Sequence, residues 1–291
     1  MTSRLSPWLT LVVMLLALPV LAADAQRTGT WGAHVREQQL QLSLHPKDKP
    51  DSHHGFSAPL ADFQGLSTAD GSSAPFKLVR EAGTFDFEGR FKDGQGVGTW
   101  RFSPDASFTK KLAELGIPKP DADEHMLLAS VNVGPQRVQA LAATGQKVTT
   151  VEELVQVGIF QVTPDYVRAM ASAGYPKLTI EQLVACRIHQ VTPERIQGYA
   201  ALGFKGLPVD SLQAMSIHGV TPDFVREMRG LGFKDLSADD LVAMRIHGVT
   251  PAFVKEMREA GYENATAQDF ISMRIHGIDS IFVRSMSKKR K

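Results

Sequence analysis

The stretch "SIHGVTPDFVREMRGLGF" (216–233) returns 29 residues later as "RIHGVTPAFVKEMREAGY" (245–262) and, in part, as "RIHGIDSIFVRSM" (274–286). Proline keeps the same interval at positions 135, 164, 193, 222 and 251. A fixed interval of this length is typical of repeat proteins, in which each unit packs against its neighbours. The sequence therefore contains six full units, from 106–134 to 251–279, followed by a partial one.

Each unit predicts two helices joined by short turns. Thr221 is a suitable N-cap, Pro222 fits the first helical position, and Gly232 fits the left-handed position that follows a helix. The second helix carries the same signals, from a cap at Ser237 to Gly248. We expect each unit to be a helical hairpin with helices of about eleven and nine residues.

Apolar residues mark the face that each helix is expected to bury. A single hairpin of this size cannot bury enough surface to fold alone, whereas stacked copies share one continuous core. The predicted fold of residues 106–286 is therefore an α-solenoid of 29-residue helical hairpins. The expected apolar stripes are Phe224, Val225, Met228 and Leu231 in the first helix, and Leu241, Met244 and Ile246 in the second.

A row of basic side chains marks the end of the second helix in successive units. Each histidine is expected to stand just before the glycine that ends the helix, whereas Phe160 and Val131 fill this position in earlier units, so the fold does not require histidine there. Three interpretations are open: helix capping and packing, a partner-binding stripe, and a metal site. Neighbouring helices lie about 8–10 Å apart, so equivalent histidines do not converge on one ion and we expect no metal. The row comprises Arg187, His189, His218, Arg245, His247, Arg274 and His276.

Cys186 stands where the following units have Met215, Met244 and Met273. This position predicts a residue that fills the core rather than a reactive thiol.

Residues 26–105 predict a β module, so the whole chain belongs to the α+β class. "QLQLSL" (39–44) and "GTFDFEGRF" (83–91) alternate polar and apolar residues, and "KDGQG" (92–96) is a turn sequence. We expect a small antiparallel sheet of about four to six strands. The side chains expected on its buried face include Phe85, Phe87 and Phe91.

Two features of the β module resemble known sites but lack their context. Gly94-x-Gly96-x-Gly98 lies in a predicted hairpin rather than between a strand and a helix, which argues against a dinucleotide-binding loop. The segment 45–54 has metal-ligating residue types at the spacing of no defined site, so we expect a solvated loop. These residues are His45, Asp48, Asp51, His53 and His54.

Residues 1–25 have the layout of a secretory signal peptide. Arg4 precedes an apolar run (8–23), and a small-x-small site predicts cleavage after Ala25. The alternative is a membrane anchor, but the run is interrupted by Pro19 and is shorter than the roughly 17–25 residues of a spanning helix. We expect a periplasmic or secreted mature protein without a membrane span, ending in a short basic tail (287–291).

Charge and motifs narrow the function classes. The net charge of +1 at pH 7 leaves no basic excess for nucleic acid. The sequence has no H-E-x-x-H or C-x-x-C motif and no complete nucleophile elbow. We therefore expect a monomeric protein that is not an enzyme and has no cofactor.

The wording of the repeat resembles a known region of bacterial envelope proteins. "RIHGVTP-FV-EM---GY" with "LSADDLVAM", preceded by "GTFDFEGRFKDGQGVGTWRFSP", is similar to C-terminal regions of the β-lactam-sensing antirepressors of the membrane metallopeptidase family. The likeness covers roughly residues 76–286, and the peptidase part with its zinc motif is not in this sequence. The resemblance implies an exported accessory or sensor region rather than a peptidase.

Two hypotheses follow for the function. The leading one is a non-catalytic, exported scaffold of the bacterial envelope that binds a protein or peptide and has a sensory or regulatory role. The alternative is an envelope hydrolase, or a hydrolase inhibitor, with its site in the β module. A groove along the solenoid would favour the first, and a deep polar pocket around residues 45–54 would favour the second.

Overall fold

The computed structural model describes residues 26–288, with side chains up to Ser285. The predicted signal segment (1–25) and the last three residues of the predicted basic tail lie outside the described residues. The chain divides into two compact units. The first contains the residues up to Lys77 together with Phe85–Pro104, and the second contains Leu78–Thr84 together with the chain from Asp105 onward.

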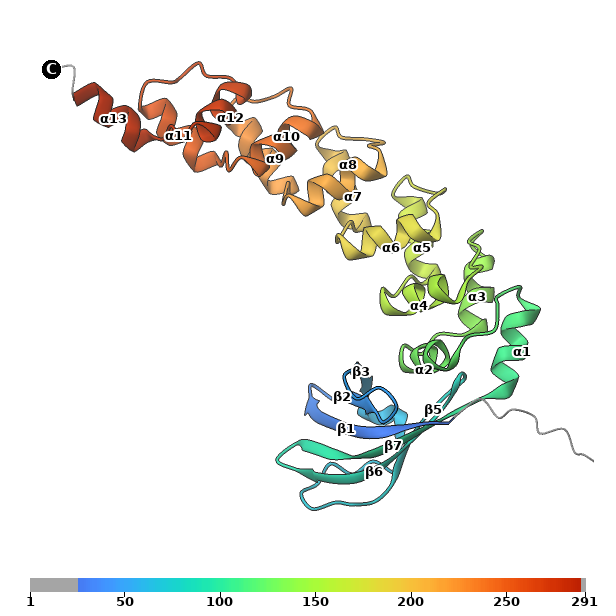
Figure 1. The fold of residues 1–291 in the computed structure, drawn as a ribbon. Helices are drawn as coiled ribbons and strands as arrows, with labels where there is room; N and C mark the ends of the chain where they lie inside the picture. Colours follow the sequence, from blue (N-terminus) through green and yellow to red (C-terminus); the bar gives the residue numbers. More distant parts are fainter. Residues whose placement is uncertain (1–25, 289–291) are drawn as a thin grey trace, which may run out of the picture. The chain divides into compact units, whose positions relative to one another are not determined.

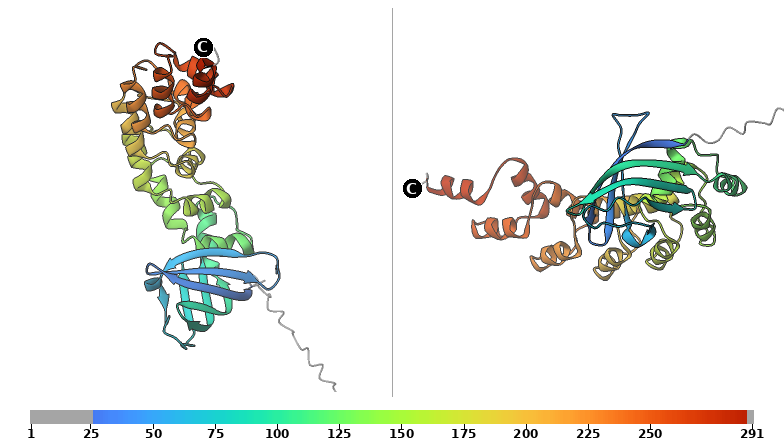
Figure 2. Two further views of the ribbon diagram at one scale, coloured as in Figure 1. Left: turned by 90° about the vertical axis from the view of Figure 1, so that its left-hand side faces the viewer. Right: turned by 90° about the horizontal axis from the view of Figure 1, so that it is seen from below.

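A curled antiparallel sheet forms the β module (Figures 1 and 2). Its seven strands follow the order β3-β2-β1-β7-β6-β5-β4, so it has one strand more than the largest number predicted. A 3-10 turn (Leu60–Asp62) precedes β4. The strands are β1 (Arg27–Arg36), β2 (Gln39–Pro46), β3 (His54–Pro59), β4 (Phe63–Gln64), β5 (Phe76–Arg80), β6 (Gly83–Lys92) and β7 (Gln95–Pro104).

An aromatic cluster fills the interior of the curled sheet. Phe85, Phe87 and Phe91 are at most 2% exposed, as their alternation in the sequence predicts. Phe56 of β3 lies 5.6 Å from Phe85 of β6, between ring centroids, although three strands separate β3 from β6 in the sheet. This contact across the sheet requires the sheet to curl, and the burial of the aromatic rings stabilises the β module.

The turn between β6 and β7 confirms the predicted hairpin. Its two central residues, Asp93 and Gly94, have φ angles of 51° and 71°. Two successive positive φ values are typical of the tight turn whose twist matches that of antiparallel strands.

Thirteen helices follow along residues 105–288, and the first twelve form six hairpins (Figure 1). The first helix of each hairpin, called an A helix here, is α1 (Ala106–Glu114), α3 (Pro135–Ala142), α5 (Pro164–Ser172), α7 (Pro193–Ala201), α9 (Pro222–Gly230) or α11 (Pro251–Glu259). The second, the B helix, is α2 (Ala122–Ser130), α4 (Val151–Ile159), α6 (Ile180–Ile188), α8 (Val209–Ile217), α10 (Ala238–Ile246) or α12 (Ala267–Ile275). A final helix, α13 (Ser280–Lys288), begins the partial unit and includes the first residues of the predicted basic tail.

The helix boundaries follow the predicted capping signals. The Thr221 hydroxyl accepts a hydrogen bond from the Phe224 amide, and Ser237 forms a capping box with Asp240. Helix α9 has nine residues rather than the expected eleven, because Leu231 is already its C-cap. In the part of the chain that the structure describes, no helix reaches the length and hydropathy of a membrane span.

The residue after the C-cap of each B helix adopts a left-handed conformation. Gly248, at φ 70°, confirms the predicted glycine stop. The prediction that every histidine precedes a glycine was wrong for His189, which is followed by Gln190 at φ 56°. Asn132 and Gln161 have equivalent positive φ values, so the backbone of the early units adopts the same turn. The turn is more strained there, because a residue with a side chain adopts this conformation less readily than glycine.

The repeats share one apolar core, which forms where helices of the same type, A or B, pack against each other. B helices contact B helices from α2 to α12, and A helices contact A helices between α1 and α3 and from α5 to α11. Cys186 is fully buried, as predicted for a residue that fills the core. The expected stripe of α10 was wrong at Ile246, which is 54% exposed, whereas Leu241 and Met244 are buried.

Candidate functional site: the exposed ends of the B helices

The predicted basic row lies at the C-terminal ends of the B helices, where its arginines connect neighbouring units. Arg245 Nε donates to the carbonyl oxygen of His218 at 3.2 Å, and Arg274 Nε donates to that of His247 at 3.3 Å. Each guanidinium therefore reaches back to the end of the preceding B helix. There it satisfies a carbonyl that has no partner within its own helix.

Each of these arginines also covers an aromatic ring of its own unit. The guanidinium carbon of Arg245 lies 5.0 Å from the ring centroid of Phe224, and that of Arg274 lies 4.9 Å from the ring centroid of Phe253. These distances are within the range of cation–π attraction.

The third predicted arginine, Arg187, follows the same plan with a different acceptor. Its Nη2 donates to the Gln161 carbonyl at 2.9 Å, and its guanidinium lies 4.0 Å from the Tyr166 ring centroid. The three arginines are therefore structural in part, because they join units, although their side chains remain exposed.

In the unit that begins at Pro193, both the aromatic residue and the arginine of this arrangement are replaced. Arg195 occupies the position of the aromatic residue, and Ser216 occupies the position of the arginine. Arg195 donates to the Ser216 hydroxyl, which in turn donates to the His189 carbonyl. The connection between units is kept although both side chains have changed.

The four histidines are C-cap residues of their B helices, and all are at least partly exposed. His276 interacts with the last turn through its own ring, since Nδ1 lies 2.8 Å from the Ser272 carbonyl oxygen. Among the described residues, no group of three or more His, Cys, Asp or Glu side chains is placed to hold a metal ion.

A row of exposed isoleucines runs beside the histidines, and the predicted apolar stripes did not identify it. Each B helix from α4 to α12 ends on an isoleucine whose side chain is 49–56% exposed. The position has one residue type in five successive units, whereas the position two residues earlier, which is buried in the first four of these units, is Val157, Cys186, Met215, Met244 or Met273. A repeated apolar residue at an exposed position is not explained by core packing. This isoleucine row consists of Ile159, Ile188, Ile217, Ile246 and Ile275.

Helical geometry contains the signal that identifies this row. Consecutive residues of an α-helix are about 100° apart, so a residue two positions after a buried one is about 200° away from it. Ile246 follows Met244 by two residues and therefore points away from the core. Four of the five isoleucines are preceded in the sequence by arginine or serine and followed by histidine, so the isoleucine row runs along the basic row.

A cavity of about 540 Å³ opens in the same region of the repeats. Its lining includes Tyr166, Arg187, Thr192 and Glu194, from α5 to the start of α7. Burial raises the pKa of the Tyr166 hydroxyl well above its usual range, with a smaller contribution from Cys186 and an opposing one from Arg187. The phenol therefore stays neutral and donates a weak hydrogen bond to the Val191 carbonyl at 3.4 Å.

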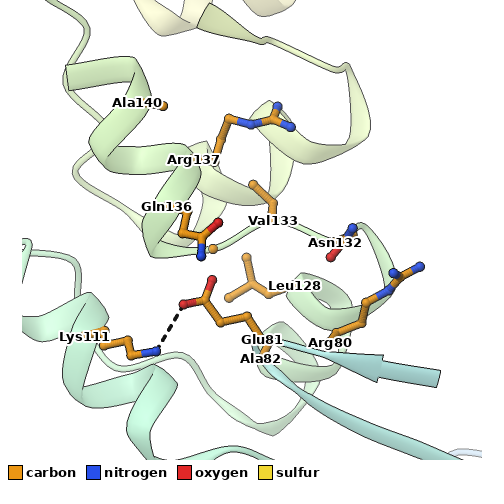
Figure 3. A pocket seen from close by; sticks show the side chains of 11 residues that line it. Arg80, Glu81, Ala82, Lys111, Leu128, Asn132, Val133, Gln136, Arg137 and Ala140 are labelled. Carbon is orange, nitrogen blue, oxygen red and sulfur yellow. Dashed lines mark hydrogen bonds and ion pairs between the residues drawn. The ribbon is translucent and has the colours of Figure 1, made fainter. Parts of the chain in front are cut away.

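A second cavity, of about 520 Å³, is lined by residues of the second compact unit, near α1 and α3 (Figure 3). Glu81 and Lys111 point toward each other and form an ion pair at 3.3 Å. Figure 3 shows the Glu81 carboxylate beside Gln136 at the start of α3, while the guanidinium group of Arg137 points away. The N-cap of α3, Gly134, has no side chain to accept a hydrogen bond, so the Glu81 charge supplies the negative group that a helix N-terminus favours. This arrangement gives the cavity a structural role.

The histidine-rich segment of the β module forms an ion pair instead of a convergent site. Asp48 Oδ2 accepts a hydrogen bond from Arg27 Nη1 at 2.6 Å, and this contact lowers the pKa of the Asp48 carboxyl. His45 and His53 lie side by side with ring centroids 6.4 Å apart. Burial lowers the pKa of His54, and the nearby His53 lowers it further.

No family model, curated protein or solved structure matches this chain, so the resemblance to the envelope antirepressors remains a prediction.

Proposed function

We propose that this chain is a non-catalytic, exported scaffold of the bacterial envelope that binds a protein or peptide along the ends of its B helices. The isoleucine row is the observation that carries the proposal. Exposed apolar residues that recur in a continuous series are typical of interaction surfaces, and helical repeats characteristically bind partners along an extended surface.

Three further features support a binding role. The arginine contacts hold successive B helices in register, so the row is presented by a rigid array rather than by loops. The cavity lined by Arg187 offers a recess beside the basic row. The apolar N-terminal segment supports export to the periplasm or the exterior. The resemblance of the repeat sequence to that of the envelope antirepressors supports a sensory or regulatory role.

The test is capture of partners from an envelope extract of the producing cells, with residues 26–291 as bait and mass spectrometry as the readout. The binding variant is Ile217→Gln with Ile246→Gln, because glutamine keeps the helix propensity and removes the apolar surface. Ile281→Gln is the matched control, since Ile281 is also exposed, at 77%, but lies on α13 outside the row. The proposal expects a partner that the wild type and the control retain and the binding variant loses. Identical captures by all three proteins would refute it.

A further inference from the structure

The spacing of the isoleucine row restricts the shape of whatever lies along it. Successive B helices pack directly against each other from α4 to α12, so equivalent side chains recur at the packing distance of helices, about 8–10 Å. The five isoleucines therefore span about 32–40 Å over four intervals. A ligand that contacts each of them must present one apolar side chain per interval.

Only some backbone conformations have this period. Side chains on one face of a β-strand recur every two residues, at about 6.6 Å, which does not match the row. A polyproline II helix has three residues per turn and rises about 3.1 Å per residue, so every third side chain recurs at about 9.3 Å. This value lies within the interval of the row.

An α-helix has a period slightly above this interval, because residues seven apart recur at about 10.5 Å. Its apolar face, moreover, is a stripe at least about 100° wide that needs a broad apolar partner. The row offers one isoleucine per helix, with histidine on one side and arginine or serine on the other in four units. Such a narrow row fits the single apolar edge of a polyproline II segment.

The charges beside the row favour a ligand with negative charge. Arg187, Arg245 and Arg274 are exposed there, and no acidic residue adjoins any of the five isoleucines in the sequence. The acidic residues of the same helices lie near their N-termini. Asp239, for example, precedes Ile246 by seven residues, a distance of about 10.5 Å along the helix and about one Debye length. Among the acids of the adjoining A helices, Asp165 and Asp223 form ion pairs within their own helices, and Glu194 lines the cavity beside Arg187.

From these observations, and resting on the proposed function, we infer that the isoleucine row binds an acidic segment in the polyproline II conformation. Every third residue of the segment is apolar and contacts one isoleucine. The acidic residues face the arginines and histidines at the helix ends. The conformation has no internal hydrogen bonds, so its backbone carbonyls are free to accept hydrogen bonds from these side chains.

Synthetic peptides of defined sequence test this inference directly. The probe is a fluorescent 15-residue peptide, (Pro-Leu-Glu)₅, which is about 46 Å long in this conformation and covers the row. Three control peptides change one property each: (Pro-Leu-Lys)₅ reverses the charge, (Pro-Ser-Glu)₅ removes the apolar residues, and a scrambled sequence removes the three-residue period. A helical peptide with leucine and glutamate in a heptad pattern represents the α-helical alternative. Affinities are measured by fluorescence anisotropy with residues 26–291.

The inference expects (Pro-Leu-Glu)₅ to bind at least tenfold more tightly than each control peptide. The Ile217→Gln, Ile246→Gln variant should weaken this binding about tenfold or more, and Ile281→Gln should leave it unchanged. Binding should also weaken as salt rises from about 50 to 500 mM, because exposed charges are screened.

Three results would overturn the inference: no binding of (Pro-Leu-Glu)₅, equal binding by the row variant, or preferential binding of the heptad peptide. If one of these occurs while the envelope capture still depends on the row, the inference fails and the proposed function stands. If the capture does not depend on the row either, both fail.

Discussion

Replacement of Arg245 by alanine tests whether the arginines join neighbouring units. The substitution removes the 3.2 Å hydrogen bond to the His218 carbonyl and the cation–π contact with Phe224. An exposed hydrogen bond from a charged donor contributes about 1 kcal/mol, and a cation–π contact at such a site about 0.5–1 kcal/mol. We expect the free energy of unfolding to fall by about 1.5–2 kcal/mol.

The assay is urea denaturation followed by circular dichroism. With a slope of about 2–3 kcal/mol per molar urea, this loss lowers the midpoint by about 0.5–1 M. Arg226→Ala is the matched control, because Arg226 is also exposed but forms only an ion pair within its own helix, with Asp223. Its midpoint should change by less than about 0.25 M, since an exposed pair at this spacing contributes about 0.2–0.5 kcal/mol.

A double-mutant cycle separates the two contributions of Arg245. Phe224→Leu keeps an apolar side chain but removes the aromatic ring, so the cation–π contribution appears as the coupling energy between the two substitutions. Equal midpoint shifts for Arg245→Ala and Arg226→Ala would refute the idea that Arg245 joins the units. A coupling energy of zero would refute the cation–π contribution alone.

Three further predictions follow from contacts described above. Ser216→Arg alone should destabilise the protein by about 1 kcal/mol because it places two guanidinium groups together, and adding Arg195→Phe should restore stability by recreating the pattern of the neighbouring units, as measured by urea midpoints. Cys186 should not react with a thiol reagent in the folded protein and should react fully in guanidinium chloride, because it is buried and burial raises the pKa of its thiol. The Asp48→Asn variant should be less stable than the wild type at pH 7, and this difference should shrink at pH 3. The contact with Arg27 lowers the pKa of the Asp48 carboxyl below its ordinary value of 3.8. The ion pair therefore stabilises the fold above pH 3.8, and this contribution is lost as the pH falls through the lowered pKa.

The helical repeat was predictable because its signals are local. Thr221, Pro222 and Gly232 each act within one turn of the helix that they begin or end, and 29-residue spacing repeats these signals. The exposed position of Ile246 was also available from the angle between it and Met244. It was missed because apolar residues were grouped by neighbourhood in the sequence rather than by helical angle.

The arginine contacts were not predictable in the same way. Arg245 and its acceptor at His218 are 27 residues apart, and nothing in either local sequence indicates the other. The only trace is the paired exchange of Arg195 and Ser216, which becomes meaningful when the three-dimensional contact is known.

Strand β1 is not indicated by a local pattern of its own either. Its glycines interrupt the alternation that identifies strands, yet it lies in the interior of the sheet between β2 and β7. Trp31 of β1 lies against Gly89 and Gly96, where an added Cβ would come within 2.6–2.7 Å of its ring. These glycines provide space for the indole, a requirement that is set by packing between strands.

The direction of the arginine contacts has a consequence for how the chain acquires its structure. For Arg187, Arg245 and Arg274 the acceptor carbonyl precedes the arginine in the chain, as His218 precedes Arg245 and His247 precedes Arg274. A growing polypeptide therefore supplies the acceptor before the donor. Each hairpin can dock as soon as it emerges, onto a neighbour that is already in place, without waiting for later sequence. The repeats are thus suited to sequential assembly from the N-terminal end.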